Sequence, residues 1–360
     1  MQVEEKYMVR CMELAEYGRL SVAPNPMVGA VIVHRGRIIG EGYHRRYGEA
    51  HAEVNAIASV RDVSLLHEAT LYVNLEPCSH FGKTPPCTQL IIRKHIPRVV
   101  VGCLDPFPEV SGRGVKMLRD AGIDVVTNVM KHEALALNRV FITAHSQKRP
   151  YIILKWAESV DGYLDRIRTS AAQAPVQLST AITRRFVHKL RSEVSAILVG
   201  TNTVRLDNPS LTVRHWVGAS PVRVFIDRRL SVPTSYHVLD GSVPTLVFTE
   251  KKQAGGGKTE YIRIDFEDEV IPQILRSLHE RRLYSLLVEG GACLHRSFLN
   301  AGLWDELQVE TAPVLLGNGV KSADIHIDET CEMKRRFCVC SSSHNKLKET
   351  IITVYSRRHL

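Results

Sequence analysis

The stretch LEPCSHFGKTPPC, residues 75–87, carries the strongest structural signal in this sequence. Its two cysteines, Cys78 and Cys87, lie between an apolar run that predicts a strand and a periodic segment that predicts a helix. Upstream, His51-Ala52-Glu53 opens another segment of helical spacing. One histidine and two cysteines suit a tetrahedral zinc ion whose fourth position is left to water. His51, Cys78 and Cys87 are therefore predicted to hold a catalytic zinc.

Glu53 lies two residues from the predicted ligand His51 and is the candidate for proton transfer. Zinc lowers the pKa of bound water to roughly 7, which yields a nucleophile at neutral pH. Glu53 is predicted to take the water proton and pass it to a leaving amino group, as the non-ligand glutamate of zinc deaminases does. Buried thiols beside a surface histidine are the competing interpretation. The order of the motifs, at a helix start, a strand end and a helix start, favours the metal.

The spacing between the two cysteines departs from the general deaminase signature, Pro-Cys-x-x-Cys. Here eight residues intervene, among them His80 and Lys83. His80 is an alternative ligand. Cys87 is preferred because it begins a predicted helix, where the positive end of the helix dipole favours a thiolate.

Strands and helices alternate on both sides of a polar break at residues 146–150. The first half predicts helices and strands at 3–17, 28–33, 37–43, 52–61, 70–75, 87–94, 98–103, 114–121, 124–128 and 132–145. The second half predicts them at 151–157, 179–191, 196–200, 222–227, 245–248, 261–264, 270–281, 285–289, 292–301, 306–316 and 337–355. Such alternation is typical of α/β layered domains, and the 360 residues predict two of them, 1–147 and 150–360.

Composition narrows the class of protein. The net charge is +9, but the basic residues form short pairs, which favours a solvated surface or phosphate pockets over a nucleic-acid track. Eight cysteines, with neither an apolar leader nor a membrane-length run, favour metal binding or buried thiols over disulfides. We expect a cytoplasmic protein that binds small molecules, and neither nucleic acid nor membrane.

Four segments of the first half form a recognisable set: APNPMVG at 23–29, GEGYH at 40–44, HAE at 51–53, and 75–87. Together they resemble the bifunctional riboflavin-biosynthesis deaminase–reductase family of bacteria. The long spacing between the cysteines is typical of that family and argues against tRNA adenosine and cytidine deaminases. The resemblance implies a cytidine-deaminase-like, three-layer α/β domain. Such a domain removes the 2-amino group of a diaminopyrimidinone that carries a phosphoribosylamino group.

The same resemblance suggests substrate contacts in the first half. Asn25, His44 and Lys83 lie in the matching motifs, so they are expected to hold the pyrimidine and its phosphate. For Asn25, a simple turn between two prolines is an equally open interpretation.

Glycines follow two predicted strands of the second half, at 199–201 (VGT) and 288–291 (VEGG). Glycine lets the backbone approach a phosphate at a helix N-terminus, although tight strand-to-helix turns explain the pattern equally well. No Gly-x-Gly-x-x-Gly follows a strand, so a Rossmann domain is not supported.

Three segments of the second half, KWAESVDG at 155–162, GTNTVRLDNPSLTVR at 200–214 and VEGG at 288–291, resemble the reductase half of the same family. The resemblance implies a dihydrofolate-reductase-like domain that uses NADPH to turn the ribose into a ribityl chain. It places the NADPH site at Ala157, Thr203, Asp207, Gly291, Ala292 and Cys293. It places the substrate site at Arg191, Leu211, Arg214 and Glu289. The arginines suit a phosphate and the glutamate suits sugar hydroxyls.

Lys155 is a candidate proton donor or substrate anchor, with a surface lysine at a strand end as the alternative. Residues 165–180 depart from the family pattern Gly-Glu-Ser-x-Trp-Ile-Thr and contain no tryptophan, so no contact is assigned there. Two other functions remain open: a nucleic-acid base deaminase with an appended binding domain, and a binding module with a structural zinc. Family members are commonly homo-oligomers, and we expect the same here.

Overall fold

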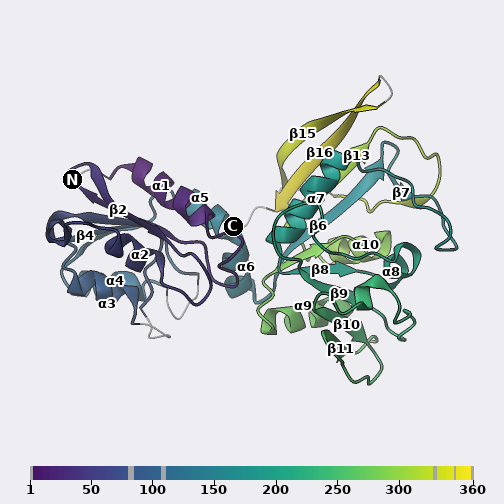
Figure 1. Ribbon diagram of the computed structural model, residues 1–360, viewed down its shortest axis with the longest axis horizontal. Helices are drawn as coiled ribbons and strands as arrows, with labels where there is room; N and C mark the ends of the chain where they lie inside the picture. The colour runs from purple at the N-terminus through teal and green to yellow at the C-terminus, as the bar shows by residue number, and fades with distance from the viewer. Residues whose placement is uncertain (1–2, 80–84, 107–110, 327–330, 344–345, 358–360) are drawn as a thin grey trace. The chain divides into compact units, whose positions relative to one another are not determined.

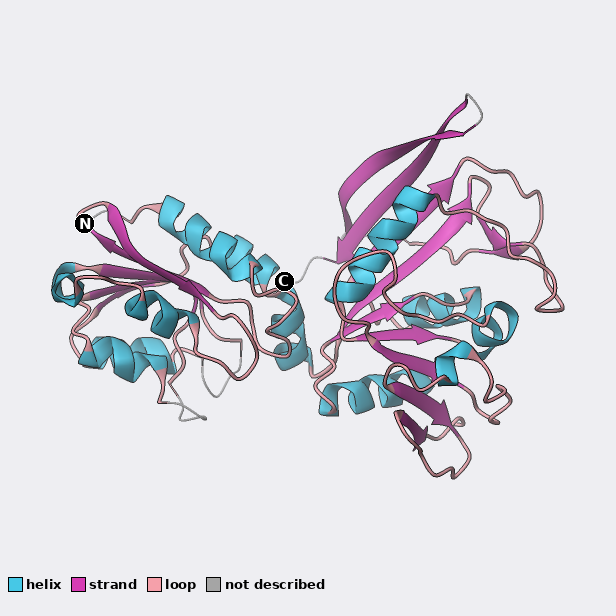
Figure 2. Cartoon of the chain, in the orientation of Figure 1, coloured by secondary structure: helices cyan, strands magenta, loops and turns pink. Residues whose placement is uncertain are grey.

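The computed structural model describes residues 3–79, 85–106, 111–326, 331–343 and 346–357. The chain divides into two compact units, Met1–Arg149 and Pro150–Leu360, and each consists of a sheet with helices packed on it (Figure 1, Figure 2). The division falls within the polar break at 146–150. None of the helices in the described residues is both long enough and apolar enough to cross a membrane.

The first unit is built on a five-stranded mixed sheet in the order β2-β1-β3-β4-β5. Its strands are β1 (Gly29–His34), β2 (Arg37–Tyr43), β3 (Thr70–Leu75), β4 (Arg98–Cys103) and β5 (Asp124–Val126). β1 runs antiparallel to both β2 and β3, whereas β3, β4 and β5 are parallel. The central strands are buried on both faces, so helices must cover the sheet on both sides.

Helices do cover both faces of this sheet. They are α1 (Glu5–Glu16), α2 (Ala52–Ala58), α3 (Cys87–Arg93), α4 (Arg113–Asp120), α5 (Lys131–Leu137) and α6 (Arg139–Gln147). Side chains alternate along β1, so Val31 and Val33 pack with α1 while Ala30 and Ile32 pack with α2, α3 and α4. The predicted three-layer arrangement of helix, sheet and helix is therefore confirmed.

The second unit contains a nine-stranded sheet in the order β11-β10-β9-β8-β12-β6-β13-β16-β15. Its strands are β6 (Tyr151–Ser159), β8 (Ala196–Val199), β9 (Val222–Ile226), β10 (Thr245–Thr249), β11 (Thr259–Arg263), β12 (Ser285–Val288), β13 (Glu306–Ala312), β15 (Cys331–Ser343) and β16 (Lys346–Arg357). The seven strands from β11 to β13 are parallel, and β16 and β15 continue the sheet antiparallel. The parallel strands therefore end at one common edge.

Four helices accompany this sheet: α7 (Ala181–Glu193), α8 (Thr201–Asp207), α9 (Val270–Glu280) and α10 (Ala292–Asn300). Helices α9 and α10 bury one side of the central strands in the main core, through residues such as Ile274, Leu278 and Phe298. Trp156 of β6 and Val309 of β13 point into the same core. Their neighbours along each strand, which include Lys155 and Glu310, therefore face the other side.

Four local features differ from the sequence-based expectations. The single helix expected at 132–145 is two helices, interrupted at Asn138, whose side chain bonds to the backbone of Met27 instead of facing solvent. The strand expected at 306–316 ends at Ala312. Two short strands, β7 (Tyr163–Asp165) and β14 (Val320–Lys321), pair in a separate ribbon that the sequence pattern did not indicate. A 3-10 turn at Val63–Glu68 and another at His237–Leu239 were also not predicted.

Candidate functional site

The three predicted zinc ligands of the first unit lie together. His51 Nδ1 is 3.6 Å from Cys78 Sγ and 3.4 Å from Cys87 Sγ, and the three donor atoms all lie within 4.8 Å of one another. The backbone N–H of Cys87 also donates to Cys78 Sγ at 3.3 Å. This is the only group of three or more metal-ligating side chains found among the described residues. One imidazole and two thiolates fit zinc, and they leave one tetrahedral position open.

Local structure explains why these donors converge. His51 is the N-cap of α2, Cys78 follows the end of β3, and Cys87 is the first residue of α3. The three positions lie where the chain enters or leaves a regular element, as the motif order predicted. A hydrogen bond with the side chain of Cys87 is the main cause that lowers the pKa of Cys78, and His51 and the Cys87 backbone add to it, so a thiolate is available to a metal at neutral pH.

Glu53 lies in the first turn of α2, two residues from His51, and is 3% exposed. Burial raises the pKa of Glu53 to about 7, and the nearby Cys78 adds to the effect. A carboxyl group with a pKa near neutrality can both accept and donate a proton under working conditions. The geometry is thus compatible with a proton shuttle next to the metal position.

Asn25 and His44, the predicted substrate contacts of the first unit, touch each other. Asn25 Nδ2 lies 3.1 Å from His44 Nε2, and His44 Nδ1 lies 3.1 Å from the Ala50 carbonyl oxygen. His44 therefore donates through Nδ1 and accepts through Nε2. Its ring also meets the His51 ring edge-on, with centroids 5.4 Å apart. The structure brings both residues to the metal position, while Lys83 and the alternative ligand His80 lie outside the described residues.

Two buried asparagines hold the loop that carries Asn25, and neither was predicted from the sequence. Asn74 accepts from the Gly29 N–H at 2.8 Å and donates to the Met27 carbonyl at 3.0 Å. Asn138 accepts from the Met27 N–H at 2.8 Å and donates to the Met27 carbonyl at 2.9 Å. A polar residue inside an apolar strand, as at Asn74, was the available signal, because a buried amide must find partners.

Glu76 performs a similar task just before the ligand Cys78. This buried carboxylate accepts backbone N–H groups of Asp105, Gly112 and Val115 at 3.1, 2.9 and 3.1 Å. It thereby ties the end of β3 to the start of α4. The Glu-Pro-Cys motif thus contributes one residue to the metal position and one to the loop beside it.

In the second unit, the predicted residues gather at the carboxyl edge of the parallel strands. β8 and β6 flank β12, and β13 flanks β6, so the segments after Val199, Val288 and Leu154 are neighbours. A Cβ added to Gly290 would lie 2.8 Å from the Val199 side chain, so only glycine allows this approach. The edge where parallel strands end is where α/β sheets usually bind ligands.

Arg191 and Glu289 form a bidentate ion pair at this edge. Arg191 Nε and Nη2 donate to Glu289 at 2.9 and 2.6 Å, and both side chains are 12% exposed. Arg191 Nη1 donates to the Thr212 carbonyl at 3.2 Å. Arg191 thus already uses one edge of its guanidinium to bind Glu289. Arg214 is therefore the better candidate for any phosphate contact.

Arg214 and Leu211 lie on the loop that follows α8. Arg214 is exposed, donates through Nη1 to Thr212 at 2.9 Å, and gives its backbone N–H to His188 Nδ1 at 3.0 Å. Leu211 is buried and has a φ of 52°, a left-handed conformation that is rare for a bulky side chain. Desolvation, together with Arg191 and Arg214, lowers the pKa of His188 to about 4. His188 is therefore neutral at pH 7, and its Nδ1 accepts the hydrogen bond that holds the loop.

Lys155 is not a surface lysine. Its side chain is 12% exposed, and Nζ lies 3.2 Å from Glu310 Oε2. Ser179 also donates to Glu310 Oε2, at 2.8 Å. Ser179 belongs to the 165–180 segment that departs from the family pattern. Neither Glu310 nor Ser179 was predicted from the sequence.

The residues predicted for a dinucleotide lie around the starts of α8 and α10. A Cβ added to Gly291 would lie 3.5 Å from Thr203 Oγ1, which places Thr203 beside the glycine pair. No side chain caps α10, whose first residues are Ala292 and Cys293. The backbone N–H groups there suit a phosphate. Asp207, at the end of α8, is ion-paired with Arg168, which belongs to the 165–180 segment.

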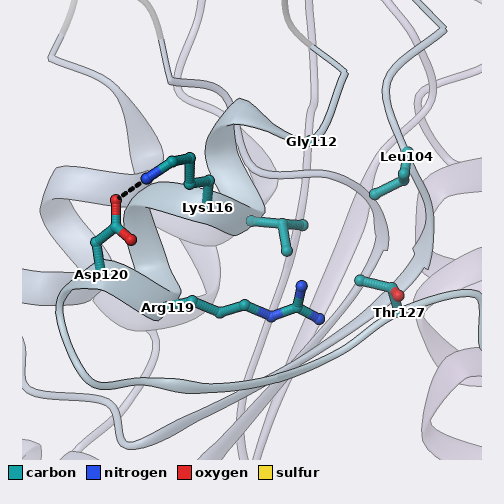
Figure 3. A pocket seen from close by; sticks show the side chains of 7 residues that line it. Leu104, Gly112, Lys116, Arg119, Asp120 and Thr127 are labelled. Carbon is teal, nitrogen blue, oxygen red and sulfur yellow. Dashed lines mark hydrogen bonds and ion pairs between the residues drawn. The ribbon is translucent and has the colours of Figure 1, made fainter.

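A separate cavity of about 300 Å³ lies in the first unit beside α4 (Figure 3). Its cationic side chains are engaged within the chain: Lys116 pairs with Asp120 at 2.6 Å, and Arg119 donates to the Val125 carbonyl at 3.0 Å. None of the predicted site residues lines it. It therefore takes no part in the sites described above.

Comparisons with known proteins cover both units. Residues 1–103 match the family model of the cytidine and deoxycytidylate deaminase zinc-binding region, and residues 150–334 match that of the RibD C-terminal domain. The chain is 40% identical over 343 residues to the riboflavin biosynthesis protein RibD of Aquifex aeolicus, covering 93% of this chain and 95% of that protein. It is 37% identical over 342 residues to the RibD of Escherichia coli, covering 88% and 90%.

A solved structure from Thermotoga maritima is also similar. It is described as a diaminohydroxyphosphoribosylaminopyrimidine deaminase/5-amino-6-(5-phosphoribosylamino)uracil reductase. The TM-score is 0.85 at 37% identity, and 98% of each chain is covered. These matches confirm the predicted combination of a cytidine-deaminase-like first unit with a dihydrofolate-reductase-like second unit. A nucleic-acid base deaminase with an appended binding domain is not favoured, because the relatives match across both units.

Proposed function

This chain belongs to the RibD family of bifunctional riboflavin-biosynthesis enzymes, and on that basis we propose the substrates and residue roles of its two steps. The first unit hydrolytically deaminates 2,5-diamino-6-(5-phosphoribosylamino)pyrimidin-4-one. The second reduces the ribose of 5-amino-6-(5-phosphoribosylamino)uracil to the ribityl chain, with NADPH as the hydride donor. The convergence of His51, Cys78 and Cys87 beside the buried Glu53 is the observation that carries the proposal.

Deamination in this proposal needs a metal, a proton shuttle and a grip on the pyrimidine. Bound zinc supplies the Lewis acidity that makes water nucleophilic at neutral pH. Glu53 takes the proton from the attacking water and delivers it to the leaving amino group. Asn25 and His44, held against each other at 3.1 Å, fix the pyrimidine edge next to His51. Lys83 is proposed to contact the phosphate.

Reduction in this proposal uses the carboxyl edge of the second sheet. When bound, NADPH supplies a hydride to the sugar carbon. The residues present fit a dinucleotide: α10 begins without a side-chain cap, so the backbone N–H groups at Gly291, Ala292 and Cys293, next to Thr203, suit a phosphate. Ala157 and Asp207 complete the proposed NADPH site.

The sugar phosphate is proposed to lie against the other residues of this edge. Arg214 contacts the phosphate, and Leu211 shapes the loop that presents it. Arg191 holds Glu289 in place, and Glu289 accepts from sugar hydroxyls. Lys155 supplies the proton that accompanies the hydride. Hydride transfer that persists in Lys155→Met would remove Lys155 from this role.

The setting of the enzyme is also proposed. Cys78 and Cys87 are free thiols that form no disulfide. They stay available to zinc in a reducing compartment, which favours the cytoplasm. The partners are small phosphorylated pyrimidines, with neither nucleic acid nor membrane involved. A homo-oligomer is expected from the family.

Mass spectrometry of the diaminopyrimidinone substrate after incubation with zinc-replete protein tests the proposal. An amino-to-oxo mass change without NADPH, followed by a two-hydrogen gain when NADPH is added, is expected. A first change without the second would leave the deaminase and refute the reductase assignment. If neither change occurs in metal-replete protein, the proposed substrate is refuted, and RNA deamination would be tested next.

A further inference from the structure

Glu310 is a buried carboxylate at the carboxyl edge of the second sheet. It is 1% exposed and lies on β13 opposite Ala157 of β6. Its neighbour Val309 enters the main core, so the Glu310 side chain projects from the opposite face of the sheet, as Lys155 does from β6. Two adjacent strands thus present a glutamate and a lysine on one face, at the edge proposed to bind the sugar.

The hydrogen bonds of Glu310 are strongly asymmetric. Its Oε2 accepts from Lys155 Nζ at 3.2 Å and from Ser179 Oγ at 2.8 Å. Its Oε1 is buried and has no hydrogen-bond partner among the described residues. Leaving a buried carboxylate oxygen unpaired is unfavourable, because the oxygen has lost its water without gaining another donor. Such a group is typical of a site that a ligand completes, because purely structural carboxylates are normally satisfied.

Of the two acids described at this edge, Glu310 is the direct partner of Lys155. The other acid at this edge, Glu289, is engaged bidentately by Arg191. Lys155 lies close enough to influence the ionisation of Glu289 and of His295, but its ion pair is with Glu310. A lysine ammonium is a flexible point charge, so its direction depends on the groups that hold it.

We infer that Glu310 is a positioning residue for the reduction step, which holds the Lys155 ammonium and the Ser179 hydroxyl toward the sugar. The inference rests on the proposed reductase function. The hydride adds to the sugar carbon of the open-chain form, and the electron pair of its carbon–heteroatom double bond moves onto the heteroatom. That atom takes a proton from Lys155, which regains one from solvent. Glu310 affects this proton transfer only through Lys155 and Ser179.

Replacing the carboxylate by an amide tests this inference in the full-length, zinc-loaded protein. Glu310→Gln is expected to lower the reductase kcat by on the order of 10- to 100-fold, the loss of one charge-assisted hydrogen bond. The KM for NADPH is expected to stay within about twofold, because the bond acts on the proton donor and not on the dinucleotide. Deamination by the same chain is the internal control and is expected to be unchanged. Glu310→Asp, which keeps the charge, is expected to recover part of the kcat.

A matched control separates positioning from general packing. Glu306 is a buried glutamate at the other end of β13, bonded to Tyr151 and Gln308. Glu306→Gln removes a buried carboxylate from the same strand but not from the Lys155 pair, so it is expected to leave the reductase kcat within about twofold.

A double-mutant cycle with Lys155→Met gives the decisive readout. If Glu310 acts through Lys155, the Gln substitution loses most of its effect once the lysine is absent. Additive losses, or unchanged kcat in both Glu310 variants, overturn the inference while leaving the reductase proposal intact. If Glu310→Gln does not fold, Glu310→Asp and its cycle with Lys155→Met carry the same test. A wild-type enzyme that shows no NADPH-dependent reduction overturns the proposed function instead, and this inference with it.

Discussion

The metal position of the first unit and the carboxyl edge of the second sheet are built in opposite ways. At the metal position, His51, Cys78 and Cys87 come from short motifs at element ends, and their donor atoms converge on one point. At the carboxyl edge, the charged groups come from several strands, a helix and a loop. There they are engaged with one another, as in the Arg191–Glu289 and Lys155–Glu310 pairs.

The difference follows from what each site has to bind. A metal position requires only that its donor atoms lie within bonding distance of one ion, so three residues suffice. A site that must orient a sugar and a dinucleotide needs buried charges, and each buried charge needs a partner to offset its desolvation. The second site should therefore lose stability when a partner is removed, whereas the first should lose chemistry alone.

The largest expected effect is on the chemistry of the first unit. Glu53→Gln is expected to lower the deamination rate by on the order of 10²- to 10⁴-fold, because it removes the general acid and base. Zinc content, measured by elemental analysis, is expected to stay at the wild-type level, since Glu53 is not a ligand. NADPH-dependent reduction of separately supplied aminouracil is the control. Unchanged deamination would exclude Glu53 as the proton shuttle.

Removing a charge from the second site is expected to lower stability. Glu289→Gln leaves the 12%-exposed Arg191 without its counter-charge, so the free energy of unfolding should fall by about 3–5 kcal/mol. Tryptophan fluorescence in urea reports this selectively, because Trp156, Trp216 and Trp304 all belong to the second unit. The control is Glu193→Gln, which breaks a more exposed i,i+4 pair with Lys189 and should cost only about 0.5 kcal/mol. Equal losses in both variants would contradict the contrast.

The second unit should also weaken in acid. His295, 1% exposed and 5.0 Å from the Trp156 ring, has its pKa lowered to about 4 by desolvation and by Lys155. The unfolded chain binds a proton near pH 6.5, so this part of the stability is complete above that pH. It is lost as the pH falls toward 4, by up to about 3 kcal/mol.

His295→Gln tests that pH dependence. The variant removes the titrating group and is expected to flatten the decline in urea midpoint, monitored by tryptophan fluorescence, between pH 7 and pH 5. His188, whose pKa is also lowered to about 4, contributes in the same direction, so some decline remains. A decline as steep as in the wild type would show that His295 does not titrate as described.

The same contrast explains what could be predicted from the sequence. The zinc ligands and Glu53 lie in contiguous motifs, so their spacing and the flanking elements were enough to predict the cluster. The strands and helices followed from their periodicity, and the main failure was at Asn138, where a hydrogen bond to Met27 from a distant loop interrupts a helical pattern. A local pattern carries no record of such a tertiary contact.

Glu310 and Ser179 could not be predicted for a related reason. They meet only because β13 lies beside β6 and the 165–180 segment returns to that edge. They are 131 residues apart in the chain, and neither belongs to a recognisable motif. Asn74 and Glu76, by contrast, left a usable signal, since both are polar residues in or at the end of a buried strand.

Removal of the metal tests most directly whether each unit carries out its own reaction. Protein treated with a chelator is supplied separately with the diaminopyrimidinone, and with the aminouracil plus NADPH, and both products are measured. Deamination is expected to be lost and to return with added zinc, while reduction of the aminouracil continues at the untreated rate. Loss of both reactions, or persistence of deamination in metal-free protein, would contradict this expectation.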